Sequence, residues 1–208
     1  MELYKFNIND FTDELFAFAY ENLSADKKEK VDRCKNEKNK KLMVAGDMLL
    51  KEALSEKGIA LTGFYKNAKG KPYIIDSPYY FNISHSEDFC ICGISDKEIG
   101  VDIEKIRKAN LKTTTKFATE NEQKYIFGKI PDEADFSLNF NNSTFDVFER
   151  FFEIWTLKES YFKMLGTGIG TDLKSVEFSI TADGVVCNKN AKMAMNKSID
   201  GYVISLSE

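Results

Sequence analysis

Apolar and polar residues alternate over several short segments, and this period of two is typical of β-strands. Turn-forming residues separate the segments, as at Lys69-Gly70-Lys71-Pro72, where Pro72 favours an extended conformation for Lys71. The alternation predicts strands at residues 3–8, 73–75, 79–84, 89–95, 99–104, 174–180 and 201–206. We expect residues 96–98 to join the fourth and fifth of these strands as a hairpin.

Other segments place apolar residues at helical spacing. The pattern predicts helices at residues 13–22, through the lysine-rich region that begins after Ser24 and turns apolar from Leu42, from about residue 120, and at 151–165. Residues 119–122 have the T-x-x-E form of a capping box, which favours a helix start there. Residues 131–144 are polar and rich in asparagine, so we expect a surface loop.

The segment Ile99–Glu104 combines a strand pattern with two acidic residues. Val101 and Ile103 are expected on one face, and Asp102 and Glu104 on the other. Adjacent carboxylates repel each other unless a cation lies between them, and Mg²⁺ prefers oxygen ligands. These residues alone leave two interpretations open, a solvated edge strand or part of a metal site.

The predicted helix 151–165 supplies a third acid and a lysine. Glu159 and Lys163 are one helical turn apart and share a stripe with the only tryptophan, Trp155. One interpretation is an exposed ion pair on the helix surface. The other is a site in which Asp102, Glu104 and Glu159 hold Mg²⁺ beside a diphosphate, provided that the helix packs against the strand.

Basic residues are concentrated between positions 27 and 41, and the only histidine, His85, lies between Ser84 and Ser86 at the end of a predicted strand. Lysine runs are most often solvated faces, and a loop histidine is most often incidental. As a group, however, these lysines are also suited to attract phosphates or an acidic protein.

Length and composition restrict the protein class. The 208 residues are enough for one large domain or two small ones, and the net charge of −4 argues against a general nucleic-acid binder. No apolar run approaches the roughly 20 residues of a membrane span, and the first residues lack a signal-peptide pattern. Four cysteines without a C-x-x-C pair fit a reducing compartment, so we expect a cytoplasmic protein, with Cys90 and Cys92 buried in a strand.

Several segments together resemble the motifs of the 4′-phosphopantetheinyl transferases of the surfactin-synthetase-activating type. They are Gly70-Lys71-Pro72, residues 81–86 (FNISHS), 100–104 (GVDIE), 117–122 (FATENE), 155–163 (WTLKESYFK) and the glycine loop Gly166-Thr167-Gly168-Ile169. They follow the family's order over roughly residues 24–180. The pair G-V-D-I-E and W-x-x-K-E-x-x-x-K at this separation is the most specific part of the resemblance.

The resemblance implies an α+β fold of two similar α/β subdomains with pseudo-twofold symmetry, each a small, mostly antiparallel sheet packed on helices. Coenzyme A would bind between the two subdomains. Residues 1–98 would form the side that contacts the 3′-phosphate and adenine, and residues 99–208 the side that contacts the metal and diphosphate. The implied reaction moves 4′-phosphopantetheine from coenzyme A to a serine of an apo acyl or peptidyl carrier protein and releases 3′,5′-ADP. It would depend on Mg²⁺, with Mn²⁺ as a substitute, in a monomer.

The resemblance also implies roles for individual residues. Asp102, Glu104 and Glu159 would be the metal ligands, with Glu159 also the base for the carrier serine. Lys163 would contact the diphosphate, with Lys158 close to it. The implied coenzyme A contacts are Lys27, Lys30, Ser84 and His85 at the 3′-phosphate and Lys71 and Pro72 at the adenine. Residues of about 105–130 would face the carrier protein.

Two other functions remain open at this point. The first is a non-catalytic protein that binds coenzyme A or a carrier protein, against which the complete set of three acids argues. The second is a different Mg²⁺-dependent enzyme that acts on a diphosphate. Carriers of fatty-acid, polyketide and peptide synthesis all remain open as partners.

Overall fold

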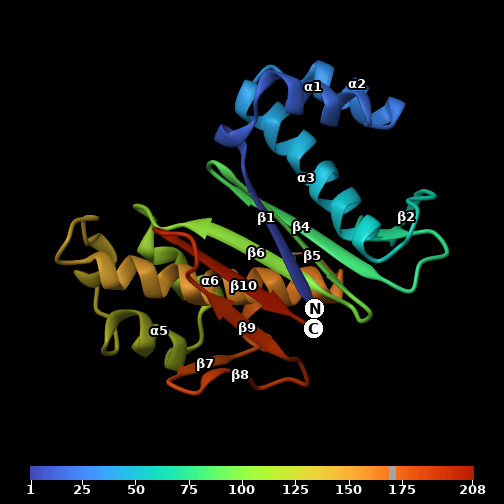
Figure 1. Ribbon diagram of the computed structural model, residues 1–208. Coiled ribbons are helices and arrows are strands. Elements are labelled where there is room, and N and C mark those ends of the chain that lie inside the picture. The colour runs from blue at the N-terminus through green and yellow to red at the C-terminus, as the bar shows by residue number, and fades with distance from the viewer. Residues whose placement is uncertain (169–171) are drawn as a thin grey trace. The chain divides into compact units, whose positions relative to one another are not determined.

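The computed structural model describes residues 1–168 and 172–208 and divides into two compact units, Met1–Ile99 and Gly100–Glu208 (Figure 1). Each unit combines helices with small antiparallel sheets, so the predicted α+β class is confirmed. No helix in the described residues is long and apolar enough to cross a bilayer.

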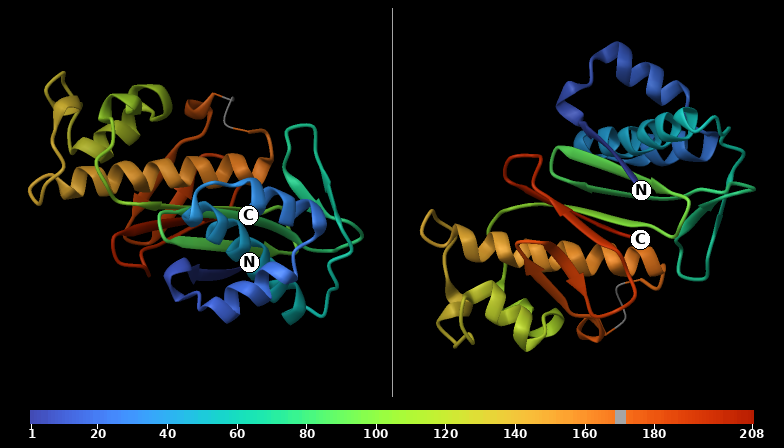
Figure 2. Two further views of the ribbon diagram at one scale, coloured as in Figure 1. Left: turned by 90° about the horizontal axis from the view of Figure 1, so that it is seen from above. Right: turned by 60° about the horizontal axis from the view of Figure 1, so that its bottom comes forward.

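The first unit is built on a three-stranded antiparallel sheet in the order β1 (Glu2–Asn7), β5 (Phe89–Ser95), β4 (Tyr80–Ser86). Helix α3 (Glu37–Glu56) runs along one face of this sheet (Figures 1 and 2). Most of its apolar residues from Leu42 onwards are buried, and so are Cys90 and Cys92, whereas Met43 is 38% exposed. The remaining elements are η1 (Ile8–Asp10), α1 (Asp13–Glu21), α2 (Ala25–Arg33) and the two-stranded ribbon of β2 (Phe64–Lys66) and β3 (Pro72–Ile74).

The second unit repeats this plan. Its main sheet has the order β6 (Gly100–Lys105), β10 (Tyr202–Ser207), β9 (Met193–Asn196), and the long helix α6 (Phe145–Leu165) packs on β6 and β10. In both units the first strand pairs with the last, and the last pairs with the strand before it. The other elements are η2 (Leu111–Thr113), α4 (Thr114–Phe117), α5 (Glu120–Phe127), η3 (Asp135–Ser137), η4 (Leu173–Ser175), β7 (Phe178–Thr181) and β8 (Gly184–Cys187).

One predicted pairing is wrong. Residues 89–95 and 100–105 do not form a hairpin, because they belong to different sheets. The hairpin instead joins β4 to β5 through the two-residue turn Glu87-Asp88, in which Glu87 has a φ of 49°. Alternation along a strand identifies the strand but contains no information about its partner.

Several boundaries also differ from the prediction. The lysine-rich region is two helices, because the side chain of Asn36 accepts a hydrogen bond from the amide of Asn39 and starts α3 afresh. Helix α6 begins at Phe145, directly after the predicted loop 131–144 and earlier than the predicted start at residue 151. Residues 174–175 lie in a 3₁₀ turn, and β8 and β9 were not predicted. The capping box of Thr119 and Glu122 is confirmed.

Candidate functional site

The site in the second unit begins with a close contact between β6 and α6. A Cβ atom on Gly100 would lie 1.9 Å from the carbonyl oxygen of Ser160 and 2.4 Å from the amide nitrogen of Met164. Only glycine permits this approach of strand to helix backbone. Because residues 100, 102 and 104 share one face of the strand, the approach directs Asp102 and Glu104 towards α6.

Three acids and two cations meet where this face of β6 lies against α6. Asp102 Oδ1 is 2.5 Å from Lys163 Nζ, and Glu104 Oε2 is 2.8 Å from Arg107 Nη1. Asp102 and Glu159 are only 4% and 7% exposed. Although β6 is at the edge of its sheet and Glu104 is partly exposed, the interpretation of a solvated strand is wrong because Asp102 is buried. The interpretation of an exposed Glu159–Lys163 pair is also wrong, because Glu159 is buried and Lys163 pairs with Asp102.

The electrostatics of this acidic cluster, defined as Asp102, Glu104 and Glu159, are unfavourable for a third negative charge. The pKa of Glu159 is raised to about 7, chiefly by burial and then by the negative charge of Asp102, with Glu104 adding to the rise and Lys163 opposing it. A carboxyl group that is disfavoured as an anion in this way is stabilised by an added cation.

The carboxylates of the acidic cluster decide whether a metal ion fits this site. Within the described residues, no group of three or more His, Cys, Asp or Glu side chains forms a ready metal site, and Asp102 and Glu104 pair with Lys163 and Arg107 instead. The donors themselves are all carboxylates, two of them buried with like charge, which is the chemistry that Mg²⁺ favours. The residues present therefore fit this ion by chemistry.

Lys158 lies elsewhere, in a buried network on another face of α6. Its side chain is 1% exposed and forms an ion pair of 2.8 Å with Glu122, whose side chain is fully buried. It also donates hydrogen bonds to the carbonyl oxygens of Leu173, at 3.0 Å, and Val176. Burial lowers the pKa of Lys158, and the charge of Glu122 opposes that change. This placement gives the predicted catalytic role of Lys158 no support.

Glu122 is a residue whose importance the sequence only partly revealed. Its carboxylate accepts hydrogen bonds from the amides of Thr119, at 2.8 Å, and Phe178, at 2.9 Å, in addition to its ion pair with Lys158. The capping-box pattern identified the first of these bonds. The other two join α5 to β7 and to α6, and no local pattern signals them.

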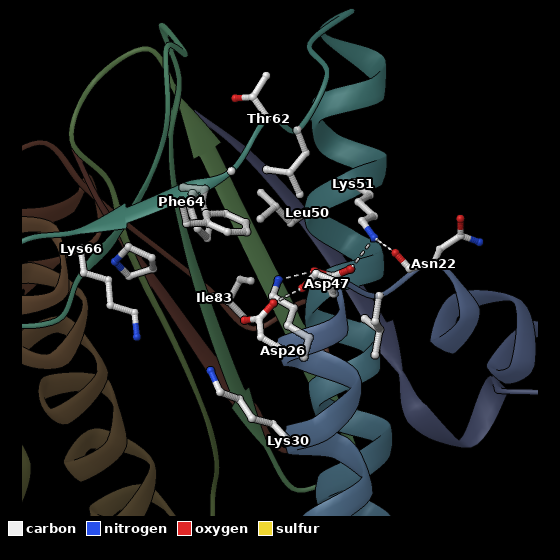
Figure 3. A pocket seen from close by; sticks show the side chains of 17 residues that line it. Asn22, Asp26, Lys30, Asp47, Leu50, Lys51, Thr62, Phe64, Lys66 and Ile83 are labelled. Carbon is white, nitrogen blue, oxygen red and sulfur yellow. Dashed lines mark hydrogen bonds and ion pairs between the residues drawn. The ribbon is translucent and has the colours of Figure 1, made fainter.

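The first unit contains a cavity of about 810 Å³ between α2, α3 and the β2–β3 ribbon (Figure 3). Lys27, Lys30 and Pro72 of the predicted coenzyme A contacts line it. Buried Asp47 of α3, missed in the sequence, pairs with Lys27 and, at 2.8 Å, with Lys51. The position of Asp47 next to apolar residues of a predicted helix did not indicate that it forms ion pairs with two lysines.

The other predicted coenzyme A contacts are not among the residues that line this cavity. The Lys71 side chain is 5% exposed and lies 2.5 Å from Glu98 and 3.2 Å from the Ile99 carbonyl oxygen. Its burial lowers its pKa, against the effect of Glu98. Ser84 is buried and His85 exposed within β4, rather than in a loop. Of the predicted glycine loop, Ile169 lies outside the described residues.

Comparisons with known proteins agree with the motifs. Residues 98–206 match the family model described as the 4′-phosphopantetheinyl transferase superfamily. The chain is 31% identical to a 4′-phosphopantetheinyl transferase of Aneurinibacillus migulanus, over 80% of this chain and 66% of the relative. It is 32% identical to one of Bacillus subtilis, over 84% of this chain and 72% of the relative. A crystal structure of Thermotoga maritima holo-[acyl-carrier-protein] synthase matches 53% of this chain and 61% of that chain, with a TM-score of 0.40 and 20% identity.

The chain spans about two thirds of the length of these curated relatives. The family match covers more than half of the chain and includes β6 and α6, which carry the acidic cluster. The predicted resemblance and the assignment to a class of transferases are thus confirmed. This chain belongs to the 4′-phosphopantetheinyl transferase superfamily.

Proposed function

We propose that the protein transfers 4′-phosphopantetheine from coenzyme A to a serine of an apo acyl or peptidyl carrier protein and releases 3′,5′-ADP, with Mg²⁺. The observation that carries this proposal is the buried acidic cluster beside Lys163, in a chain of this superfamily. The relatives are named as 4′-phosphopantetheinyl transferases, which supports the same reaction for this chain.

In the proposed reaction the serine oxygen forms a bond to the β-phosphorus of coenzyme A. The bond from that phosphorus to the bridging oxygen breaks, and its electron pair stays on the α-phosphate of 3′,5′-ADP. Glu159 accepts the serine proton, directly or through a water molecule. The Lys163 ammonium stabilises the negative charge that develops on the phosphate oxygens.

Asp102, Glu104 and Glu159 would hold the Mg²⁺. When bound, this ion supplies a Lewis acid that polarises the diphosphate oxygens. The raised pKa of Glu159 supports the assignment, because a cation relieves the repulsion among the buried carboxylates. Mn²⁺ shares the preference for oxygen ligands and is expected to substitute.

We assign the nucleotide part of coenzyme A to the first unit. The cavity there is large enough for a nucleotide. Lys27, Lys30 and Pro72 line it, and we retain Lys71, Ser84 and His85 as further proposed contacts. We assign residues of about 105–130 to the carrier protein, because carriers are acidic and this segment begins with Lys105, Arg107 and Lys108. A monomeric, cytoplasmic protein remains our expectation.

The decisive experiment incubates the full chain with coenzyme A, Mg²⁺ and several apo carrier proteins in separate reactions. The intact mass of each carrier is then measured. We expect a gain of one phosphopantetheine group on at least one carrier and no gain when EDTA removes the metal. Tight binding of coenzyme A without a mass gain on any carrier would contradict the proposal and favour a non-catalytic binding protein.

A further inference from the structure

Glu153 of α6 is a buried acid that the proposed reaction does not use. Its side chain is 4% exposed and accepts a hydrogen bond of 2.6 Å from the hydroxyl of Tyr125, on α5. Lys197, directly after β9, pairs with the same carboxylate at 2.5 Å. A buried carboxylate without partners would be costly, so the phenol and the ammonium group together stabilise this position of Glu153. One side chain of α6 therefore joins three segments of the second unit.

The bond from Tyr125 is well suited to hold α5 in place. The pKa of Tyr125 is raised, chiefly by burial and then by the hydrogen bond to Glu153, so its hydroxyl remains a donor at neutral pH. Hydrogen bonds to a charged acceptor are shorter and stronger than bonds between neutral groups. Lys197 also pairs with Glu149, at 3.0 Å, but the Tyr125–Glu153 bond does not involve that second acid.

Helix α5 is attached to α6 at two successive positions on one side of the helix (Figure 1). Glu122, in its first turn, pairs with Lys158, and Tyr125, three residues later, binds Glu153. A helix of eight residues that is attached at a single point can pivot about it. The second attachment, together with the packing of the buried Ile126, fixes the direction of the helix axis.

The direction of α5 matters because of what the neighbouring segments carry. Exposed lysines follow the segment that we assign to the acidic carrier protein, at Lys112, Lys116 and Lys124. Helix α6 carries Glu159 and Lys163, to which we assign the reaction. The Tyr125–Glu153 bond thus joins the proposed docking segment to the helix that holds the reacting groups.

We propose that Tyr125 and Glu153 are positioning residues, which set the direction of α5 on α6 and thereby the affinity for the carrier protein. The inference rests on the proposed function for the identity of this partner. It adds two residues that lie outside all the sequence motifs, and it assigns them no contact with coenzyme A or with the reacting atoms.

The test compares Tyr125→Phe with the wild type in the transfer assay, at saturating coenzyme A and varied apo carrier protein. The substitution removes one hydroxyl group and keeps the ring. We expect KM for the carrier to rise about tenfold, as for a lost hydrogen bond to a charged group. We expect kcat and KM for coenzyme A to stay within about twofold of the wild type. A merely structural bond would lower the midpoint of thermal unfolding without changing KM for one substrate alone.

Tyr20→Phe is the matched control. The hydroxyl of Tyr20 donates to the carboxylate of Asp32 at 2.7 Å, and this bond joins α1 to α2 in the first unit. The control variant loses the same kind of bond between two helices. It should keep the KM values of the wild type for both substrates, whatever it loses in thermal stability.

Binding of the same apo carriers to the full chain, measured by titration calorimetry, tests docking without turnover. Tyr125→Phe should weaken this binding about tenfold. The inference is overturned if KM and the dissociation constant for the carrier are unchanged in Tyr125→Phe, if KM for coenzyme A rises equally, or if the wild type binds no carrier. A wild type that binds a carrier but adds no mass to it would contradict the transfer reaction alone.

Discussion

Lys158 and Lys163 lie on the same helix, α6, and each pairs with a buried carboxylate, yet their surroundings differ. The Lys158–Glu122 pair has side-chain exposures of 1% and 0%, and backbone groups complete its hydrogen bonds. In the Lys163–Asp102 pair the lysine side chain is 27% exposed, and a second buried acid, Glu159, lies beside it.

The difference separates a structural ion pair from one that is suited to chemistry. Every strong partner of Lys158 comes from the protein, so a substrate would have to break this network in order to reach it. Lys163 is partly open, and the acids beside it are better satisfied by an added cation than by one lysine. An ion-pair motif in the sequence cannot distinguish these two cases, since both lysines belong to the same W-x-x-K-E-x-x-x-K segment.

The largest expected effect concerns the catalytic side of the comparison. Glu159→Gln should lower the rate of transfer at least about 10³-fold, because it removes both a metal ligand and the proposed base. The midpoint temperature of thermal unfolding should stay the same or rise slightly, because the substitution removes a buried carboxyl group next to Asp102. Mass spectrometry of the carrier and circular dichroism measure the two quantities.

Glu149→Gln is the control on the same helix, since Glu149 pairs with Lys197 and not with the acidic cluster. It should transfer at the wild-type rate. A folded Glu159→Gln variant with substantial activity would show that the role given to Glu159 is wrong.

For the structural ion pair, Lys158–Glu122, we predict a loss of stability when the lysine is removed. Lys158→Met leaves Glu122 buried without its cation and should lower the free energy of unfolding by about 3–5 kcal/mol. Lys163→Met should cost less, because this lysine is partly solvated, although the buried Asp102 also loses its ion pair with Lys163. Urea denaturation of both variants measures the difference. Adding Glu122→Gln to Lys158→Met should recover part of the unfolding free energy that Lys158→Met loses. Equal losses for the two lysines would remove the distinction between the pairs.

Gly100→Ala tests the contact that brings the acids to α6. The new methyl group meets backbone atoms of Ser160 and Met164, so β6 and α6 must move apart, which should cost about 1–3 kcal/mol or more. Transfer should fall as well. Gly46→Ala is the matched control, because its methyl group would meet a side-chain atom, Cγ2 of Ile83 at 3.3 Å, rather than backbone atoms. If both substitutions are tolerated equally, the close approach at Gly100 does not determine the site.

The smallest effect is stabilisation by the metal. At ten times its dissociation constant, Mg²⁺ should add about 1.4 kcal/mol to the unfolding free energy of the wild type. This corresponds to a rise of about 3–6 °C in the thermal midpoint. Asp102→Asn should abolish the rise, and Glu149→Gln should keep it. An equal rise in wild type and Asp102→Asn would place the ion elsewhere.

The sequence supported the elements that local periodicity determines and the motifs that recur in order. The buried stripe of α3, the capping box at Thr119 and the fold class are confirmed. The strand partner of β6 was not predictable, because β10 lies about a hundred residues later along the chain and alternation says nothing about register between strands.

The site was predicted unevenly for a similar reason. The period of β6 indicated that Asp102 and Glu104 share a face, and the structure adds Glu159 to them because Gly100 lets α6 approach. The same motif suggested that Lys158 lies near the diphosphate, but its environment depends on Glu122 and Val176, which are distant in sequence. Asp47 and Lys66 belong to no pattern and became visible only as the walls of a cavity.

The contact at Gly100 also bears on how this protein can diverge. Since β6 and α6 touch backbone to backbone, the spacing between their acids does not depend on the length of the chain that connects them, residues 106–144. Phe117, Glu122 and Ile126 anchor the first part of that connection in the core, whereas residues 128–144 are not buried and can gain, lose or exchange residues at little thermodynamic cost. Recognition of new protein partners can therefore evolve there while the reacting groups keep their positions.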